Sequence, residues 1–243
     1  FGFLEGPAVD PNGDLFFTDI PNERIYQWSP QDGVTVFRER SGRANGLRFD
    51  SDGNLLVCEM GNRRVTALDP RGVTTVLADQ IEGRRFNSPN DLWVDTKGGI
   101  YFSDPRYGPT DDQEIPGYHV YYISPNREAI RQVTRDLIRP NGIIGTPDGD
   151  RVYIADHGAG RTYVYFSTSL VSGTLELGAA DVIITGDVDR DGGETAGPLS
   201  GGELLGGNTG LQPTWTLWGL TNNTAAPRVR GLAFTPEGAS GAL

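Results

Sequence analysis

The sequence predicts an all-β protein of the β-propeller class, and three observations predict it. A hairpin pattern, with a short alternating stretch, a turn glycine and a β-rich return stretch, occurs at residues 5–19, 45–60, 88–104 and 141–156. In each copy the turn glycine lies eight positions after a polar residue, and this spacing aligns Glu5, Asn45, Asn90 and Asn141. These starts are 40, 45 and 51 residues apart, a period that is typical of propeller blades with several short strands each.

Each copy predicts the first two strands of a blade, because apolar and polar residues alternate on both sides of the glycine. The predicted strands are 8–10 and 15–20, 47–50 and 55–59, 92–95 and 100–104, and 143–145 and 151–155. Two further alternating stretches follow in the first three units: RIYQWSP and VTVFRE, RRVTALDP and VTTVLAD, and HVYYISP and AIRQVTRD. Four strands per unit form one blade.

The third unit carries an insertion between its second and third strands. This insertion loop, residues 105–118, is rich in proline, glycine and acids. A long loop on a rigid scaffold commonly edges a functional site. A solvated connector is an equal alternative.

The chain is predicted to form one domain over residues 1–243, with recognisable blades in residues 1–167. Residues 168–243 hold 15 of the 34 glycines, so we expect this part to be irregular or poorly ordered. A weaker fifth copy, from Arg230 to Gly238, begins 89 residues after Asn141, which leaves room for one unrecognised copy. Because that fifth hairpin has no return strand after it, the sequence predicts an incomplete propeller.

Composition excludes several kinds of partner. A net charge of −11 argues against nucleic acid, whose phosphates need basic patches, and suits a cation. No run reaches the roughly 18 to 20 apolar residues of a membrane span, so no membrane partner is expected. The lone Cys58 excludes an internal disulfide and is predicted to be buried. We expect a soluble monomer, and since the chain opens at Phe1, a trimmed leader and hence the compartment, cytoplasmic or periplasmic and secreted, stay open.

The four aligned polar residues, called the register residues below, are the candidate functional site. The innermost strands of a propeller line its central channel, so residues at one register in different blades meet near the axis. Here the register residues supply one carboxylate, from Glu5, and three amide oxygens, from Asn45, Asn90 and Asn141. Oxygen ligands of this kind suit a hard cation such as calcium. The alternative, that each Asn-Gly pair merely forms a left-handed turn, does not explain Glu5 or Asn90-Asp91.

Three motifs resemble those of a known family. EGPAVDPNGDLFFTD, SPNDLWVDTKGGIYFSDPRYG and RPNGIIGTPDGDRVYIAD are similar, in this order, to the gluconolactonase and regucalcin family, over roughly residues 3–165. That family comprises six-bladed propellers that are metal-dependent lactonases with phosphotriesterase-like relatives. The resemblance implies a six-bladed fold and one divalent metal facing Glu5, Asn90 and Asn141. Calcium is expected first, with zinc, magnesium and manganese as alternatives.

The resemblance also implies a fourth ligand that doubles as the general base, an aspartate in a later Ser-Asp-Gly motif, and no such motif follows Asn141 in the sequence. Asp187, Asp189 and Asp191 in GDVDRDGG lie roughly where the missing blade would start. They resemble the opening of a calcium-binding loop, but the acid required at its twelfth position is replaced by Pro198, which favours an acidic turn. Asp91 is therefore the predicted catalytic base, as the nearest carboxylate in the recognised part.

Other polar residues are candidates for holding a substrate. Arg43, Asn45, Arg106 and Tyr107 are predicted to bind an anionic or polyhydroxylated molecule, with surface solvation as the equal alternative. His119 and His157 lie in or beside strands and are predicted to be structural. No serine or cysteine has the surroundings of a nucleophile.

The predicted function is metal-dependent hydrolysis of a lactone, foremost a sugar lactone such as gluconolactone, by polarisation of the carbonyl and carboxylate-assisted attack of water. One alternative is a non-catalytic propeller that binds a metal or a sugar, or an inactive fragment. A further alternative is hydrolysis of a phosphotriester on the same metal.

Overall fold

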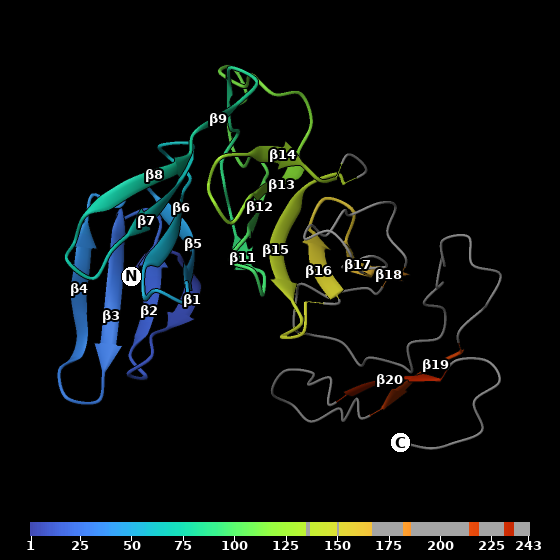
Figure 1. The fold of residues 1–243 in the computed structure, drawn as a ribbon, viewed down its shortest axis with the longest axis horizontal. Helices are drawn as coiled ribbons and strands as arrows, with labels where there is room; N and C mark the ends of the chain where they lie inside the picture. Colours follow the sequence, from blue (N-terminus) through green and yellow to red (C-terminus); the bar gives the residue numbers. More distant parts are fainter. Residues whose placement is uncertain (135–136, 150, 167–181, 186–213, 219–230, 236–243) are drawn as a thin grey trace.

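The computed structural model describes residues 1–134, 137–149, 151–166, 182–185, 214–218 and 231–235. All regular secondary structure in these residues is β-strand, and four antiparallel sheets of four strands follow one another along the chain. In Figure 1 the four sheets lie side by side in chain order, from blue to yellow. The all-β propeller architecture is thus confirmed, with four blades in the described part. No helix there is long and apolar enough to cross a membrane.

Each blade is a meander whose strands pair in sequence order. Blade 1 contains β1 (Leu4–Val9), β2 (Leu15–Asp19), β3 (Arg24–Ser29) and β4 (Gly33–Glu39), and blade 2 contains β5 (Ala44–Phe49), β6 (Leu55–Glu59), β7 (Arg64–Leu68) and β8 (Thr74–Ala78). Blade 3 contains β11 (Leu92–Val94), β12 (Ile100–Asp104), β13 (His119–Ile123) and β14 (Ile130–Gln132), and blade 4 contains β15 (Pro140–Gly145), β16 (Arg151–Asp156), β17 (Arg161–Phe166) and β18 (Val182–Thr185). A hairpin of β9 (Gln80–Ile81) and β10 (Arg84–Arg85) joins blades 2 and 3.

The hairpin turns are built by an aspartate and a glycine, as the sequence pattern predicts. In the first blade one carboxylate oxygen of Asp10 accepts the backbone N–H groups of Asn12 and Asp14, both at 2.9 Å. Gly13 in the same turn has φ +93°, a conformation that favours glycine. Asp50 and Asp95 form the same bonds in the next two blades. The polar turn residues therefore fix where each pair of strands reverses.

The core lies between the blades, because both faces of a blade are apolar. In β6, Leu55 and Val57 pack toward blade 1, whereas Leu56 and Cys58 pack toward blade 3. This explains why β6 is buried along its whole length instead of alternating. Cys58 is buried as predicted. A third cluster, around Tyr101 and Tyr122, joins blades 3 and 4.

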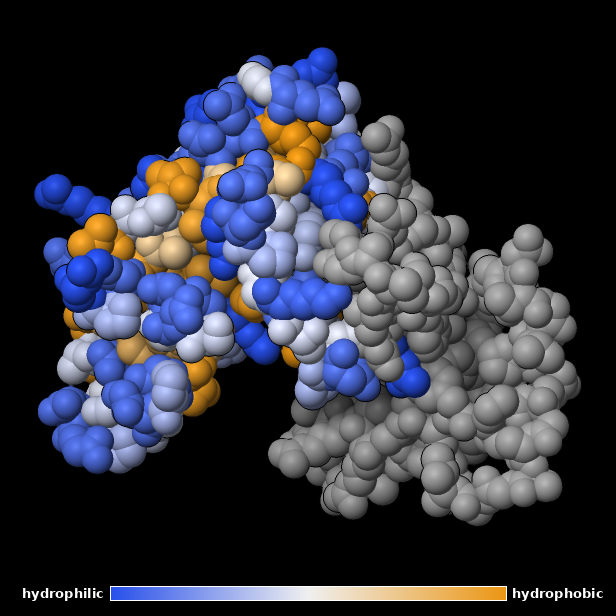
Figure 2. Space-filling model, in the orientation of Figure 1, coloured by the Kyte–Doolittle hydropathy of each residue, from blue (hydrophilic) through white to orange (hydrophobic). Residues whose placement is uncertain are grey.

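One face of blade 1 stays open in the described part of the chain. Val9, Trp28, Val34 and Val36 share this face through the register of their strands, and they are between 41% and 60% exposed. Apolar side chains reach the surface in this region (orange at the left of Figure 2).

In the described part of the tail, β20 (Gly231–Thr235), within the fifth copy, pairs antiparallel with β19 (Thr214–Trp218), the strand before it. The sequence pattern does not specify this partner, because a single alternating run carries no sign of which neighbour it pairs with. The expectation that the rest of residues 168–243 is irregular falls outside the described residues.

Candidate active site

The register residues converge on one cavity of about 460 Å³. Glu5, Asn45, Asn90 and Asn141 all line it, together with the residue that follows each of them in the chain: Gly6, Gly46, Asp91 and Gly142. The inner strands β1, β5, β11 and β15 contact one another in this order, so the cavity lies where four blades meet. The structure thus brings together side chains that lie up to 136 positions apart in the sequence.

Three of the four register residues, Glu5, Asn45 and Asn141, lie at a shift in strand pairing of the kind a β-bulge makes. The pairing of β1 with β2 shifts between Glu5 and Ala8, that of β5 with β6 between Ala44 and Leu47, and that of β15 with β16 between Pro140 and Ile143. A bulge bends the strand and changes the direction of its side chains. β1, β5 and β15 therefore begin earlier than the sequence predicts, because their pairing extends to both sides of the shift, whereas β11 begins at Leu92 as predicted.

Three of the register residues are preceded by a clamped backbone segment. The carboxylate at the end of the second strand accepts the N–H groups that lie three and two positions before the register residue. Asp19 accepts those of Gly2 and Phe3, before Glu5. Asp104 binds the segment before Asn90 and Asp156 the one before Asn141, with bonds of 2.7 to 2.8 Å.

Blade 2 departs from this rule. Its strand-end acid is Glu59, whose buried carboxylate pairs with Arg64 at 2.7 Å and Arg38 at 3.2 Å. It also accepts a bond from the Thr66 hydroxyl. The clamped segments are therefore those that precede Glu5, Asn90 and Asn141, the three residues predicted to face a metal.

The inner strands approach each other closely at the residue after the register position. The Gly46 N–H donates to the carbonyl of Asn90 at 2.7 Å, and a Cβ on Gly46 would lie 2.7 Å from that same oxygen. A Cβ on Gly6 would lie 2.0 Å from the carbonyl oxygen of Asn45. Hydroxyl groups add further links: Thr18 donates to the carbonyl of Asn45, and Ser103 to that of Asn141. Glycine is required here because backbone meets backbone.

The side-chain oxygens at the cavity suit a hard divalent cation as ligands. The amide nitrogen of Asn45 donates to the sulfur of Met60 at 3.1 Å, and that of Asn141 donates to the hydroxyl of Tyr107 at 2.9 Å. Because the N–H ends of these amides are bonded elsewhere, their oxygens remain available. No hydrogen bond joins the Glu5 carboxylate or the Asn90 amide to another described residue. One carboxylate and several amide oxygens form an all-oxygen set, which is the kind calcium prefers.

The other common kind of metal site is built from three or more acid, cysteine or histidine side chains. In the part of the chain that the structure describes, no group of three or more of these side chains could hold a metal ion. Asp187, Asp189 and Asp191 lie outside the described residues.

Asp91, the predicted base, is the second carboxylate at this cavity, beside Glu5. One of its oxygens accepts the N–H of Leu92 and the other that of Ile143, both at 2.9 Å. Burial raises the pKa of Asp91 above its ordinary value, and the negative charge of Glu5 adds to this, while the two N–H bonds and Arg48 oppose it. Asp91 thus ties blade 3 to blade 4 and still presents a carboxylate to the cavity.

The predicted substrate-binding residues occupy three different positions. Asn45 lines the cavity. Tyr107 reaches its edge through its bond to Asn141. Arg43 is exposed beside Gly61 and has a left-handed backbone with φ +55°.

Arg106 takes a structural position. Its three guanidinium nitrogens donate to the carbonyls of Pro109 and Asn87 and to the carboxylate of Asp112. The group is therefore occupied in holding the insertion loop.

Two arginines near the site were not predicted from the sequence. Arg48 lines the cavity, although regular alternation would turn a residue three positions after Asn45 to the opposite face. The pairing shift between Ala44 and Leu47 interrupts that alternation. Arg139 lies over the ring of Tyr107, with 5.4 Å from its guanidinium carbon to the ring centre. Nothing in the sequence pairs Arg139 with Tyr107, because one precedes the first strand of blade 4 and the other lies in the insertion loop of blade 3.

The two histidines lie near the insertion loop. A ring nitrogen of His119 is 3.0 Å from the carbonyl of Pro116, and the His119 ring contacts Tyr121 edge-on. His157 contacts the ring of Tyr107, with 5.9 Å between ring centres. Neither histidine lines the cavity of the register residues.

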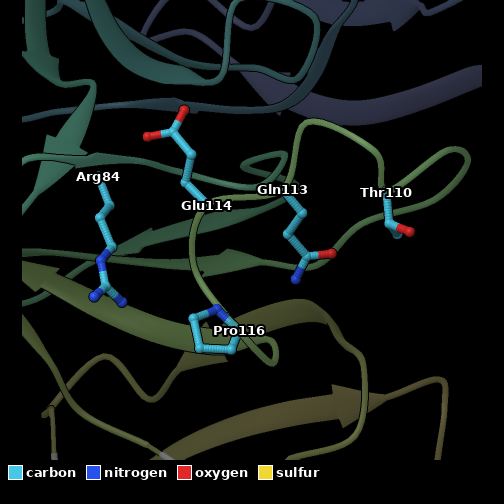
Figure 3. A pocket seen from close by; sticks show the side chains of 5 residues that line it. All are labelled: Arg84, Thr110, Gln113, Glu114 and Pro116. Atoms are coloured by element: carbon cyan, nitrogen blue, oxygen red, sulfur yellow. The ribbon is translucent and has the colours of Figure 1, made fainter.

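A second hollow, of about 750 Å³, lies away from the register residues. Figure 3 shows its lining: Arg84 of β10 on one side, and Thr110, Gln113, Glu114 and Pro116 of the insertion loop. It is widely open to solvent, and no candidate functional residue lines it.

Comparison with known proteins points to one family. The family model described as SMP-30/Gluconolactonase/LRE-like region matches residues 3–193. A gluconolactonase of Zymomonas mobilis is 34% identical over 185 residues, which is 66% of this chain and 51% of the relative. Lactonase drp35 of Staphylococcus epidermidis is 27% identical over 169 residues, 66% of this chain and 50% of the relative.

A solved structure agrees with these matches. That of a gluconolactonase from Xanthomonas campestris has a TM-score of 0.63 and 28% identity, and the match covers 69% of this chain and 59% of that one. The chain spans about half the length of the curated relatives it matches.

Proposed function

Because this chain belongs to the SMP-30/gluconolactonase/LRE-like family, we propose that it hydrolyses a lactone, foremost a sugar lactone, at the cavity of the register residues. The observation that carries the proposal is the convergence of Glu5, Asn90, Asn141 and Asp91 on one cavity from three blades. The similar proteins named as a gluconolactonase and a lactonase support the same reaction class.

Glu5, Asn90 and Asn141 would hold one divalent cation, and calcium suits this all-oxygen set best. Zinc is less suited because the set holds no histidine or cysteine, whereas magnesium and manganese also accept oxygen ligands. When bound, the cation supplies a Lewis acid that polarises the ring carbonyl and stabilises negative charge on its oxygen.

Asp91 would act as the general base. Each carboxylate oxygen has a second lone pair beyond the one that accepts a backbone N–H, so a water molecule can still donate a proton to it. As Asp91 takes this proton, the water oxygen bonds to the carbonyl carbon and the ring carbon–oxygen bond then breaks. The leaving alkoxide receives the proton from Asp91, which yields a hydroxy acid and restores the carboxylate.

The remaining polar groups would orient the substrate. Asn45 and Arg48 line the cavity and can bind the hydroxyl and ring oxygens of a sugar lactone. Tyr107 and Arg43 would contribute at its edge. Arg106 is left out of this set because all three of its nitrogens are bonded to the loop.

The test is turnover of gluconolactone by the 243-residue chain, first after treatment with a chelator and then with calcium added back. We expect activity to depend on the metal and to fall by about 100-fold or more in Glu5→Gln and Asn141→Ala, as for the loss of other groups that stabilise the oxyanion. Glu39→Gln is the matched control, because Glu39 is an exposed acid in a surface ion pair.

Two outcomes would contradict the proposal. Full activity in the chelated protein would exclude the metal-dependent reaction. Calcium binding without turnover of any lactone would instead favour a non-catalytic binding propeller, and a panel that includes phosphotriesters separates the hydrolase alternatives.

A further inference from the structure

We propose that Tyr107 is a positioning residue: its hydroxyl holds the Asn141 amide with the oxygen toward the cavity, and the insertion loop is the arm that holds Tyr107 in place. This inference rests on the proposed function, in which Asn141 binds the cation. It gives the loop a role in the site, in place of that of a solvated connector.

The first step is the chemistry of the amide. An asparagine side chain has an oxygen that binds cations and an NH₂ group that repels them, and a rotation of half a turn exchanges the two. The Asn141 nitrogen donates to the Tyr107 hydroxyl at 2.9 Å, across 34 positions of sequence. In this arrangement the hydroxyl accepts from the NH₂ group and leaves the amide oxygen free. In the rotated amide the oxygen would instead accept from the hydroxyl, and the NH₂ group, which cations repel, would face the cavity. Outer partners of metal ligands commonly act in this way.

The second step is the fixation of Tyr107 itself. Its ring is contacted by the guanidinium of Arg139, at 5.4 Å, and by the ring of His157, at 5.9 Å between centres. Both residues belong to the segments that flank β15 and β16, the hairpin that carries Asn141. The ring is therefore held against the same blade whose ligand its hydroxyl binds.

The third step is the anchoring of the loop. Asp112 bonds to two arginines: to Arg106, the neighbour of Tyr107, and to the buried Arg63 at 3.1 Å. Both arginines also donate to backbone carbonyls, Arg106 to Asn87 and Arg63 to Phe86. These bonds tie the loop to the connection between blades 2 and 3, where Figure 3 shows it running beside β10.

The fourth step is the comparison with the other register residues. The Asn45 amide donates to the sulfur of Met60, a weak acceptor, and the Asn90 amide has no hydrogen bond to a described residue. Among the three amides, Asn141 thus has the strongest partner for its NH₂ group. Removing the Tyr107 hydroxyl should therefore disturb an amide orientation more than removing the Met60 sulfur would.

The experiment is a calorimetric titration of the 243-residue chain with calcium chloride, for the wild type, Tyr107→Phe and Tyr118→Phe. Tyr118 is the matched control, because its ring also contacts the guanidinium of Arg139, at 5.8 Å, whereas the hydroxyl bonded to the Asn141 amide is that of Tyr107. Tyr107→Phe keeps the ring and removes only the hydroxyl. We expect it to weaken calcium binding by about 10-fold, and Tyr118→Phe to bind as the wild type does.

A double-mutant cycle shows whether Tyr107 acts through Asn141. Calcium affinity and the unfolding free energy of the calcium-free protein are measured for Tyr107→Phe, Asn141→Ala and the double variant. We expect Tyr107→Phe to have no further effect in the Asn141→Ala background, in either measurement. The unfolding measurement keeps the coupling visible where Asn141→Ala abolishes calcium binding.

Three outcomes would overturn the inference. Wild-type calcium affinity in Tyr107→Phe contradicts it while leaving the proposed function intact. An equal loss of affinity with and without Asn141 shows that Tyr107 acts by another route. A wild-type chain that binds no divalent cation contradicts the proposed function and removes this inference with it.

Discussion

Asp19, Asp104 and Asp156 show how a single residue type prepares the site. Each is buried at the end of a second strand and accepts two backbone N–H groups just before a register residue. An aspartate suits this task because its short side chain keeps the carboxylate close to its own backbone. Glu59 is one methylene longer and binds Arg64 and Arg38 instead.

Asp104 makes stability depend on pH. Burial raises its pKa to about 7, although the N–H bonds from Asn87 and Ser88 and the charges of Arg63 and Arg106 oppose the shift. In the unfolded chain the carboxyl ionises near its model value of 3.8. The contribution of Asp104 to the unfolding free energy is therefore complete below pH 3.8. It is lost as the pH rises through the folded-state pKa of about 7.

We expect the unfolding free energy contributed by Asp104 to fall by up to about 3 kcal/mol between pH 5 and pH 8. Denaturant unfolding of the wild type and Asp104→Asn across this range measures it. The variant should be less stable overall, since its NH₂ group cannot accept an N–H, and its stability should vary less with pH. Equal pH slopes in the two proteins would contradict the assignment.

The inner strands are the elements that place the register residues. The pairing shifts in β1, β5 and β15 redirect the side chains, and Gly6 and Gly46 allow adjacent strands to approach. Gly46 and Gly142 hold equivalent places after Asn45 and Asn141, yet their surroundings differ. A Cβ on Gly46 would lie 2.7 Å from backbone atoms of blade 3, whereas one on Gly142 would meet nothing closer than 3.7 Å.

This contrast predicts opposite effects of the same substitution. Gly46→Ala should lower the unfolding free energy by about 1 to 3 kcal/mol, because two strands must move apart. Gly142→Ala should be neutral or stabilise by up to about 1 kcal/mol, because it restricts the unfolded chain without a clash. Denaturant unfolding checks both, and similar losses in the two variants would refute the close approach at Gly46.

At the scale of the whole molecule, the candidate site brings residues of blade 1 together with residues of blades 3 and 4, which do not follow it directly along the chain. Glu5 belongs to blade 1, Asn90 precedes the first strand of blade 3, and Asn141 belongs to blade 4. A cation held by all three would connect the first described blade to the last. Binding to the folded form alone also stabilises that form by mass action.

Calcium should therefore raise the unfolding free energy, by about 2.7 kcal/mol at a free concentration 100 times the dissociation constant. Thermal unfolding with calcium, and again after a chelator, measures the effect. Glu5→Gln should show a much smaller increase, because it lacks the one carboxylate among the register residues. An unchanged unfolding temperature in the wild type at saturating calcium would contradict a site shared by three blades.

The repeated hairpins, their turn aspartates and glycines, the burial of Cys58 and the alignment of the register residues could all be predicted from the sequence. These features depend on local rules: alternation of side chains along a strand and the preferences of turn residues. The family resemblance over roughly residues 3–165 follows from the same motifs. The partner of β20 could not be predicted, because an alternating run does not specify its neighbour.

The arrangement around the site was decided by the tertiary structure. Asn141 and Tyr107 lie 34 positions apart, and Asp91 and Ile143 lie 52 apart, so their bonds exist only once the blades pack. The same holds for Arg106, whose guanidinium binds Asn87 and the loop instead of facing the cavity. A sequence determines which groups a chain carries and its local conformations, whereas the partners of a long side chain depend on which distant backbone and side-chain groups the packed fold brings within hydrogen-bonding distance.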